Sequence, residues 1–590
     1  MILTMAICLS PDDTYLAAGL ALMVLVYAFD HISGAHYNPT VSLSQLAAGR
    51  MTLVMCALYI VVQVLGGITG ALLSYAVAGT SNIQEFKPDP KLSHPDLSAV
   101  FVEGLFAFSL SLVQQQVSHQ NQLEPNSYTG IAIGSSLLAG VSAAGGISGG
   151  CFNSAVGTGR DLAALFHGGS MGSIWVYWVG PPIGGILSGV LSSWLVFMFQ
   201  KEQEESKALQ LRKAEAEAQG SPAPGPGDDG DRRLSLRVPL VEMIGAFFIT
   251  LVAALGGHPL AVGAMVTAMV HMGDHMCGGD YNPAVSFGIL ARFGYIADAW
   301  KTCIVSLAQV VGAVLAGFAA FVLKGKVEFN GPEGSHGPAG AAVFEFIWTG
   351  MLVYTVWACT TPILDAWEQA ANREGHQASY HGLAIGMVYA IGRYMAGANG
   401  AGSGGYFNPA MATGVASAAL ASGEESGKWM WVYWVAGLGG SILGGAVFSL
   451  LHAHTDVDAM ADQGLGMGAG VDPDLLGGDM GMGMDPQQLM FAHAHADSDL
   501  EDAGSALAPP RNYSDGTAPS LGISSGRGGG GGGYEPPYAV APGDSGRDFS
   551  VGSGSIASRG AGGGSARRVS KPTLVSEDEG DRSLRFARGR

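Results

Sequence analysis

Charged residues are scarce in this chain. Only 13% of its 590 residues are Asp, Glu, Lys or Arg, and its mean hydropathy is positive, at +0.28. An average soluble domain carries about 25% charged residues, so this composition excludes an ordinary soluble enzyme. It is typical of a protein that crosses a membrane several times, with lipid as its surroundings.

Paired cysteines and a targeting signal are also lacking. The six cysteines are scattered without a Cys-x-x-Cys spacing, which excludes a recognisable disulfide framework or zinc site. The N-terminal segment "MILTMAICLSP" has no basic residue before its apolar part, which argues against a signal peptide, and we interpret it as the end of a transmembrane span. No nucleophile stands with an accompanying base, so the sequence predicts no enzyme, cofactor or metal. The net charge of −19 indicates no nucleic-acid partner, because much of the acid lies in the two polar stretches outside the apolar runs, where it keeps those segments solvated.

Long apolar runs are what the chain has in abundance. A helix needs about 20 mostly apolar residues to span a bilayer. Eleven such runs occur, five before a polar stretch at 201–237 and six after it. They are 14–33, 52–77, 99–117, 128–146, 174–199, 238–256, 259–277, 299–323, 339–360, 380–398 and 429–451.

The polar stretch at 201–237 divides the chain. It begins as charged, helix-favouring sequence and ends rich in Pro, Gly and Asp, which is typical of a linker. Its seven Lys and Arg residues predict a cytoplasmic location by the positive-inside rule. We therefore expect one unit over 1–200, a second over 238–452, and a cytoplasmic tail over 453–590. The tail is rich in Gly, Met, Ser and Asp, a composition that predicts disorder.

Two sequence motifs occur in both units. "HISGAHYNPTVS" at 31–42 is matched by "HMCGGDYNPAVS" at 275–286, and "GGCFNSAVGTG" at 149–159 by "GGYFNPAMATG" at 404–414. Four copies at corresponding places in apolar sequence argue against a chance occurrence of the tripeptide. The four tripeptides are Asn38, Pro39 and Thr40; Asn153, Ser154 and Ala155; Asn282, Pro283 and Ala284; and Asn408, Pro409 and Ala410.

Each motif predicts the start of a short helix. Asn is a favoured N-cap, and Pro is favoured at the first helical position because its missing N–H would be unpaired there. The apolar sequence that follows is about ten residues long, too short to span a membrane, so we expect half-helices. Irregular backbone at membrane depth is tolerated where it lines a cavity. Two half-helices that meet at the midplane would repel cations with their positive ends, while the asparagine amides donate to a neutral molecule.

These motifs resemble those of the aquaporins, the major intrinsic protein family. "WVYWVG" at 175–180 and "WVYWVA" at 431–436 also resemble the start of the last span of that family. The resemblance covers 14–199 and 238–451 and implies an all-α membrane protein made of two tandem units. Each unit would have six spans, two half-helices and one pore, and two chains would supply the four units in which the family assembles. The implied function is a passive channel for water or small uncharged solutes.

The resemblance also implies that glutamates in the first and fourth spans brace the half-helix loops. The second unit has both, as Glu242 and Glu345, whereas the first has only Glu103 because its first span is essentially absent. We therefore expect the first unit to be degenerate or incomplete at its N-terminus, and the second unit to carry most of the flux.

The selectivity constriction of the family is formed by four positions per unit, one of them an arginine three residues after the second asparagine. Neither unit has that arginine. The resemblance therefore implies wide, apolar constrictions that favour glycerol, urea, ammonia or hydrogen peroxide over strict selection of water. Counted from the asparagines, the positions are Ala18, Val141, Gly150 and Val156 in the first unit, and Val262, Ala396, Gly405 and Met411 in the second.

Arg393 lies within an apolar span, where an arginine is unfavourable by roughly 2.5–3.5 kcal/mol. It precedes Ala396 by three residues, so both lie on one helix face. We hypothesise that Arg393 points into the pore and supplies the missing positive charge. The alternatives are a pairing with a carboxylate such as Glu242 or Glu345, or an extended side chain that reaches the cytoplasmic surface.

Two other functions fit part of this sequence. A secondary transporter with inverted repeats also uses broken helices, but it needs intramembrane acids for coupling, and here the bracing positions account for them. A non-conducting membrane scaffold or sensor that acts through its long tail fits a degenerate first unit.

Overall fold

The computed structural model describes residues 1–10, 12–78, 85–123, 126–219, 235–293, 299–332, 337–360, 380–398 and 402–451. Within these ranges the regular structure is helical, with no strand. The all-α fold class predicted from the sequence is therefore confirmed. The predicted disordered tail and the Pro/Gly-rich part of the linker lie outside the described residues.

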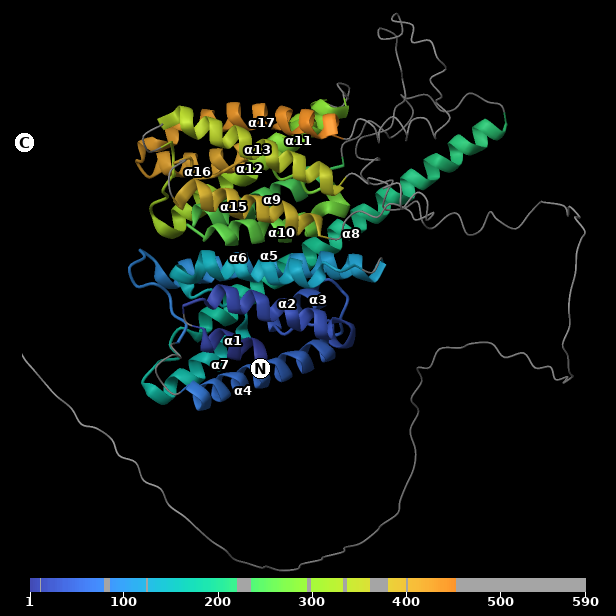
Figure 1. The fold of residues 1–590 in the computed structure, drawn as a ribbon. Helices are drawn as coiled ribbons and strands as arrows, with labels where there is room; N and C mark the ends of the chain where they lie inside the picture. Colours follow the sequence, from blue (N-terminus) through green and yellow to red (C-terminus); the bar gives the residue numbers. More distant parts are fainter. Residues whose placement is uncertain are drawn as a thin grey trace, which may run out of the picture. The chain divides into compact units, whose positions relative to one another are not determined.

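The described residues form eight α-helices in the first unit and another eight in the second (Figure 1). Those of the first unit are α1 (Ile2–Leu9), α2 (Thr14–Ser33), α3 (Pro39–Ala47), α4 (Leu53–Ala78), α5 (Pro95–Leu123), α6 (Thr129–Ser148), α7 (Ser154–Ala164) and α8 (Ile174–Ala218). Those of the second are α9 (Arg237–Ala254), α10 (Pro259–Cys277), α11 (Pro283–Phe293), α12 (Ala299–Lys324), α13 (Gly337–Thr360), α15 (His381–Ala398), α16 (Pro409–Ala421) and α17 (Met430–Leu451).

All eleven predicted spans are helices in the structure. Nine helices in the described part of the chain are long and apolar enough to cross a membrane. The other two predicted spans are α10 and α15, which have 19 and 18 residues. Helix α8 runs for 45 residues, so the charged first part of the linker continues the last span of the first unit.

The two units pack their helices in the same order. Helix α2 pairs with α6 as α10 pairs with α15, and α4 packs on α7 as α12 packs on α16. Helix α1 contacts α2, α4 and α7. Helix α9 contacts the corresponding helices of the second unit, α10, α12 and α16. Eight residues in the first unit therefore occupy part of the place that the 18 residues of α9 fill in the second.

Close glycine contacts fix how α6 and α15 cross their partners. Gly134 on α6 lies directly against Gly19 on α2, and a Cβ at either one would overlap the other's carbonyl oxygen. Gly386 on α15 lies in the same way against Gly263 on α10. Gly134 and Gly386 are therefore structurally equivalent. A residue that follows Gly134 on α6 by a given number of positions corresponds to the residue that follows Gly386 on α15 by the same number.

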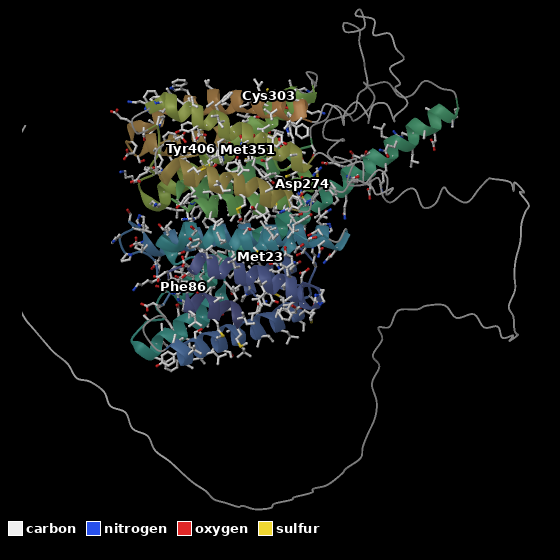
Figure 2. All side chains as sticks on the ribbon, in the orientation of Figure 1. Met23, Phe86, Asp274, Cys303, Met351 and Tyr406 are labelled. Carbon is white, nitrogen blue, oxygen red and sulfur yellow. The ribbon has the colours of Figure 1, made fainter. Side chains whose placement is uncertain are left out.

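The units contact each other through α5 and α6 of the first and α9 and α10 of the second, and side chains fill the space between the helices (Figure 2). The backbone N–H of His258 donates to the Ser142 hydroxyl (3.1 Å), and Tyr128 stacks on His271 with ring centroids 4.3 Å apart. The C-terminal end of the linker lies near one end of α10, because Arg237 at the start of α9 donates to the carbonyl of Met276. We call this the linker side.

Candidate functional site: two asparagine pairs and their loops

Each of the four motif asparagines caps a half-helix. The side-chain oxygen of Asn408 accepts the N–H groups of Ala410 (2.9 Å) and Met411 (3.2 Å) at the start of α16. Asn153 caps α7 in the same way, while Asn38 and Asn282 each accept one N–H two residues further on. The caps satisfy N–H groups that have no partner within a helix. The predicted half-helices are therefore α3, α7, α11 and α16, which have 9, 11, 11 and 13 residues.

The residue before each asparagine is aromatic and has a left-handed backbone. The φ angles of Tyr37, Phe152, Tyr281 and Phe407 lie between 49° and 51°. Large side chains seldom adopt this conformation, which is unfavourable by about 1–3 kcal/mol.

This conformation directs the carbonyl of each aromatic residue toward the opposite asparagine. Asn38 donates to Phe152 O (2.8 Å) and Asn153 to Tyr37 O (2.9 Å). In the second unit the same pairs join Asn282 to Phe407 O (2.8 Å) and Asn408 to Tyr281 O (2.9 Å). Each pair of half-helices is thus joined end to end by two reciprocal hydrogen bonds. We call the path beside Asn38 and Asn153 the first pore, and the path beside Asn282 and Asn408 the second pore.

Buried glutamates hold three of the four loops from behind. Glu345 accepts the N–H groups of Tyr406 (3.0 Å) and Phe407 (2.7 Å), and also the hydroxyl of Ser403 (2.9 Å). Glu103 makes the equivalent set of three bonds in the first unit. These carboxylates stabilise the left-handed residues, because each accepts the N–H of one of them.

The two units differ at the other loop. In the second unit Glu242 accepts the N–H groups of Asp280 (3.0 Å) and Tyr281 (2.7 Å). In the first unit no carboxylate reaches the corresponding loop within the described residues. Its contacts are neutral instead, because the Ser42 hydroxyl bonds both His36 (3.0 Å) and Gln63 (3.0 Å).

The repeated "WVYW" motif anchors the second loop of each unit. Tyr177 donates to Ser148 O (2.7 Å), and Tyr433 donates to Ser403 O (2.6 Å). The following tryptophans donate from Nε1 to a half-helix threonine, Thr158 or Thr413, at 2.9 Å. The repeat at 175–180 and 431–436 therefore has a structural cause, since both copies fix a half-helix and its loop.

The first pore contains a cavity of about 10 Å³. A single water molecule needs roughly 10–15 Å³ on this measure, so the cavity is about the size of one water molecule. Both asparagines line the cavity, as do Val141 and Val156 of the predicted constriction, whereas Ala18 and Gly150 do not. Its lining is otherwise mostly apolar: the remaining residues are Leu3, Ile7, Leu22, His36, Val41, Leu110, Gln114, Leu137 and Cys151.

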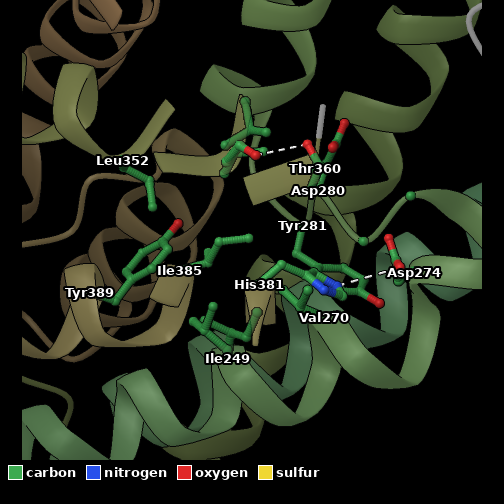
Figure 3. A pocket seen from close by; sticks show the side chains of 15 residues that line it. Ile249, Val270, Asp274, Asp280, Tyr281, Leu352, Thr360, His381, Ile385 and Tyr389 are labelled. Carbon is green, nitrogen blue, oxygen red and sulfur yellow. Dashed lines mark hydrogen bonds and ion pairs between the residues drawn. The ribbon is translucent and has the colours of Figure 1, made fainter. Parts of the chain in front are cut away.

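The second unit has a cavity of about 20 Å³ in a different place (Figure 3). It lies toward the linker side, where its wall includes Asp274, Asp280 and His381, and its inner wall includes Tyr389. Nε2 of His381 lies 3.4 Å from a carboxylate oxygen of Asp274, as the dashed line in Figure 3 shows. The motif asparagines do not line this cavity, and neither do the predicted constriction residues Val262, Ala396, Gly405 and Met411.

Tyr389 lines this cavity and also hydrogen-bonds the asparagine pair. Nδ2 of Asn282 donates to the Tyr389 hydroxyl (2.8 Å) as well as to Phe407 O, so both of its hydrogens are used. The side chain of Asn408 interacts with the same hydroxyl. In the first pore, by contrast, no described protein group accepts the second N–H of Asn38 or Asn153.

The comparisons with known proteins agree with this geometry. The family model described as "Major intrinsic protein" matches residues 4–192 and 242–452, more than half of the chain and one match for each unit. The chain belongs to the major intrinsic protein family. It is 33% identical over 169 residues to "Aquaporin NIP1-1" of Zea mays (28% of this chain and 57% of that protein). It is 34% identical over 186 residues to "Aquaporin Z" of Rhodopseudomonas palustris (30% and 75%).

A third relative is the "Lens fiber major intrinsic protein" of Homo sapiens, 32% identical over 187 residues (31% of this chain and 68% of that protein). The matched part of the chain spans 57% of the length of the NIP1-1 relatives from maize and rice. With two tandem units of the major intrinsic protein family, the chain is an integral, multi-pass membrane protein of a channel family.

The structure corrects one count made from the sequence. Val141 lies seven residues after the crossing glycine Gly134, and the residue seven after Gly386 is Arg393, not Ala396. In agreement, a Cβ at Gly150 would meet Val141 Cα at 3.0 Å, and one at Gly405 would meet Arg393 Cα at 2.7 Å. The count failed because the segment from the crossing glycine to the asparagine is three residues longer in the second unit. The first-unit counterpart of Arg393 is therefore Val141 rather than Leu138.

Arg393 is buried beside the loop that follows α15. Its Nη1 lies 3.4 Å from the carbonyl oxygen of Gly405, and its guanidinium lies over the Tyr406 ring, 5.4 Å from the centroid. It forms no ion pair within 4 Å with Glu242 or Glu345 among the described residues. It also lines neither of the two cavities described above.

Sequence reasoning missed Tyr389. The pattern that identifies it is the spacing from the crossing glycine, since Tyr389 follows Gly386 by three residues as Leu137 follows Gly134. For metals, the described residues contain no group of three His, Cys, Asp or Glu side chains placed to hold an ion.

Proposed function

We propose that this protein is a passive channel for water or small uncharged solutes. The observation that carries the proposal is the first pore, where two asparagine amides each keep an N–H free beside a cavity with mainly apolar walls. A neutral molecule with a lone pair can accept these hydrogen bonds in passing. The N-termini of α3 and α7 meet there, and their positive ends make the same place unfavourable for cations.

The apolar constriction sets the class of solute. Val141 and Val156 offer no charge and no hydrogen bond to a permeating molecule. Water, ammonia and hydrogen peroxide are close in size to the cavity. Urea and glycerol are larger and need the lining side chains to move apart. We therefore expect the smaller neutral molecules to pass faster.

The two units are not equivalent as conductors. The sequence favours the second unit, which has both bracing glutamates. The free asparagine amides and the cavity between them favour the first. We assign the flux of the wild-type chain to the first pore. The two glutamates that brace the loops of the second unit, Glu242 and Glu345, then serve the stability of the protein.

Membrane orientation and assembly belong to the same proposal. The seven basic residues of the linker support a cytoplasmic location for the linker and the tail. Two chains would together supply four units, the number that the resemblance implies.

Stopped-flow light scattering of vesicles that hold the purified full chain tests this function. We expect swelling faster than in empty vesicles under water, urea and glycerol gradients. Val156→Arg adds a long charged side chain to the first pore, so it should lower urea and glycerol flux several-fold and water flux less. Val415→Ala, a buried change on α16 away from the first pore, is the matched control.

Swelling no faster than in empty vesicles, from protein shown to be folded, would contradict the channel. It would favour a non-conducting scaffold, for which the occupied second pore is the supporting observation.

A further inference from the structure

We infer that Tyr389 closes the second pore at mid-membrane and so determines which of the two pores conducts. Its hydroxyl lies between the two asparagines of the second unit, where a permeating molecule would have to accept their hydrogen bonds. This inference rests on the proposed channel function and adds the residue that separates an open pore from a closed one.

Hydrogen bonding is the first argument. An amide nitrogen of asparagine has two hydrogens to donate. Asn282 gives one to Phe407 O and the other to Tyr389, both at 2.8 Å. A solute that entered here would have to displace the hydroxyl, which then needs a new partner in a low-dielectric site. In the first pore no such exchange is required, because no described protein group accepts the second N–H of Asn38 or Asn153, and both residues line the cavity.

Packing is the second argument. Tyr389 is 4% exposed, and its ring centroid lies 6.3 Å from that of Phe407. The cavity on the linker side reaches Tyr389 but not the asparagines behind it. The ring therefore stands between the linker-side cavity and the middle of the pore.

The equivalent residue of the first unit is the third argument. Leu137 occupies the place of Tyr389, three residues after the crossing glycine of its helix. It lines the first cavity together with both asparagines. A leucine has no hydroxyl and is shorter than a tyrosine, so it leaves the amides free. The two units therefore have the same fold but differ at this position. The leucine leaves the asparagine amides of the first pore free, and the tyrosine hydroxyl accepts a hydrogen bond in the second pore.

The experiment exchanges these two residues in the full chain. The variants are Tyr389→Leu, Leu137→Tyr and the double exchange, each in vesicles at equal protein content. Tyr389→Leu should raise water permeability per chain by up to about twofold over the wild-type value, because a second pore would conduct in parallel with the first. Leu137→Tyr should remove most of the wild-type flux. The double exchange should restore it through the second pore.

The outcomes separate this inference from the proposed function. A wild-type chain that conducts, together with a folded Tyr389→Leu chain that conducts no faster, overturns the closure by Tyr389 and leaves the channel standing. If the wild-type chain does not conduct and the Tyr389→Leu chain does, the closure by Tyr389 is supported and the proposed channel function of the wild type is contradicted. If both are silent, both ideas fail. Should the leucine variant not fold, Tyr389→Met, which also lacks the ring and the hydroxyl, takes its place under the same criteria.

Discussion

At the scale of single residues, both pores depend on a strained aromatic residue held by hydrogen bonds on two sides. The N–H of Phe407 is fixed by Glu345, and its carbonyl is fixed by Asn282. Its left-handed φ of 51° is unfavourable for a phenylalanine, and these contacts compensate for it. The second loop of each unit has this arrangement, whereas the first loop of the first unit lacks the carboxylate.

We predict that Glu345→Ala destabilises the protein strongly. The change leaves the N–H groups of Tyr406 and Phe407 without an acceptor in the interior, at roughly 1–3 kcal/mol for each buried group. Glu345→Gln keeps one acceptor oxygen and should lower the unfolding temperature less. The measurement is thermal unfolding in detergent. Glu328→Ala, at an exposed ion pair with Lys326, is the control and should leave the unfolding temperature unchanged. Equal unfolding temperatures for Glu345→Ala and the control would contradict the bracing role.

At the scale of helices, the point at which two helices cross determines which of their residues face the pore. The four asparagine motifs, three of which continue with proline, predicted the half-helices correctly, because capping is a local property that a few neighbouring residues determine. The pore-facing residues of α15 could not be counted in the same way. Their place depends on the contact between Gly386 and Gly263, which lie far apart in sequence. The loop between α15 and Asn408 is longer than its counterpart in the first unit, so counting back from Asn408 does not identify the equivalent residues.

We predict that Gly386→Ala disturbs the second unit. A Cβ there would overlap the carbonyl of Gly263 and the hydroxyl of Thr267, which forces α15 away from α10. Overpacking of this kind typically destabilises by about 1–3 kcal/mol. Gly397→Ala on the same helix meets no atom within 4 Å and is the matched control. Lower thermal stability for the first variant and not for the second is the expected result in detergent. The opposite order would disprove this crossing.

At the scale of the whole molecule, one interface between units is already made within the chain. Helices α5 and α6 of the first unit are covered by α9 and α10 of the second. The corresponding helices of the second unit, α13 and α15, carry exposed large apolar side chains on their outer faces. These include Phe346, Ile347 and Met351 on α13, and Met387, Ile391 and Tyr394 on α15.

We predict that two chains assemble so that α13 and α15 of each one contact α1 and α2 of the other. This repeats the contact already present within the chain and closes a ring of four units. Native mass spectrometry in mild detergent should show particles of two chains. Ile391→Arg, which puts a charge on the outer face of α15, should shift them toward single chains, whereas Leu450→Arg, at an exposed position on α17, should not. Single chains in the wild type would contradict this assembly.

The difference at Leu137 and Tyr389 has a consequence for how the cell sets membrane permeability. One messenger encodes both pores, so every round of translation delivers one of each. Changes in expression alter the number of pairs but never the ratio within a pair. The amount of expression therefore cannot adjust one pore relative to the other.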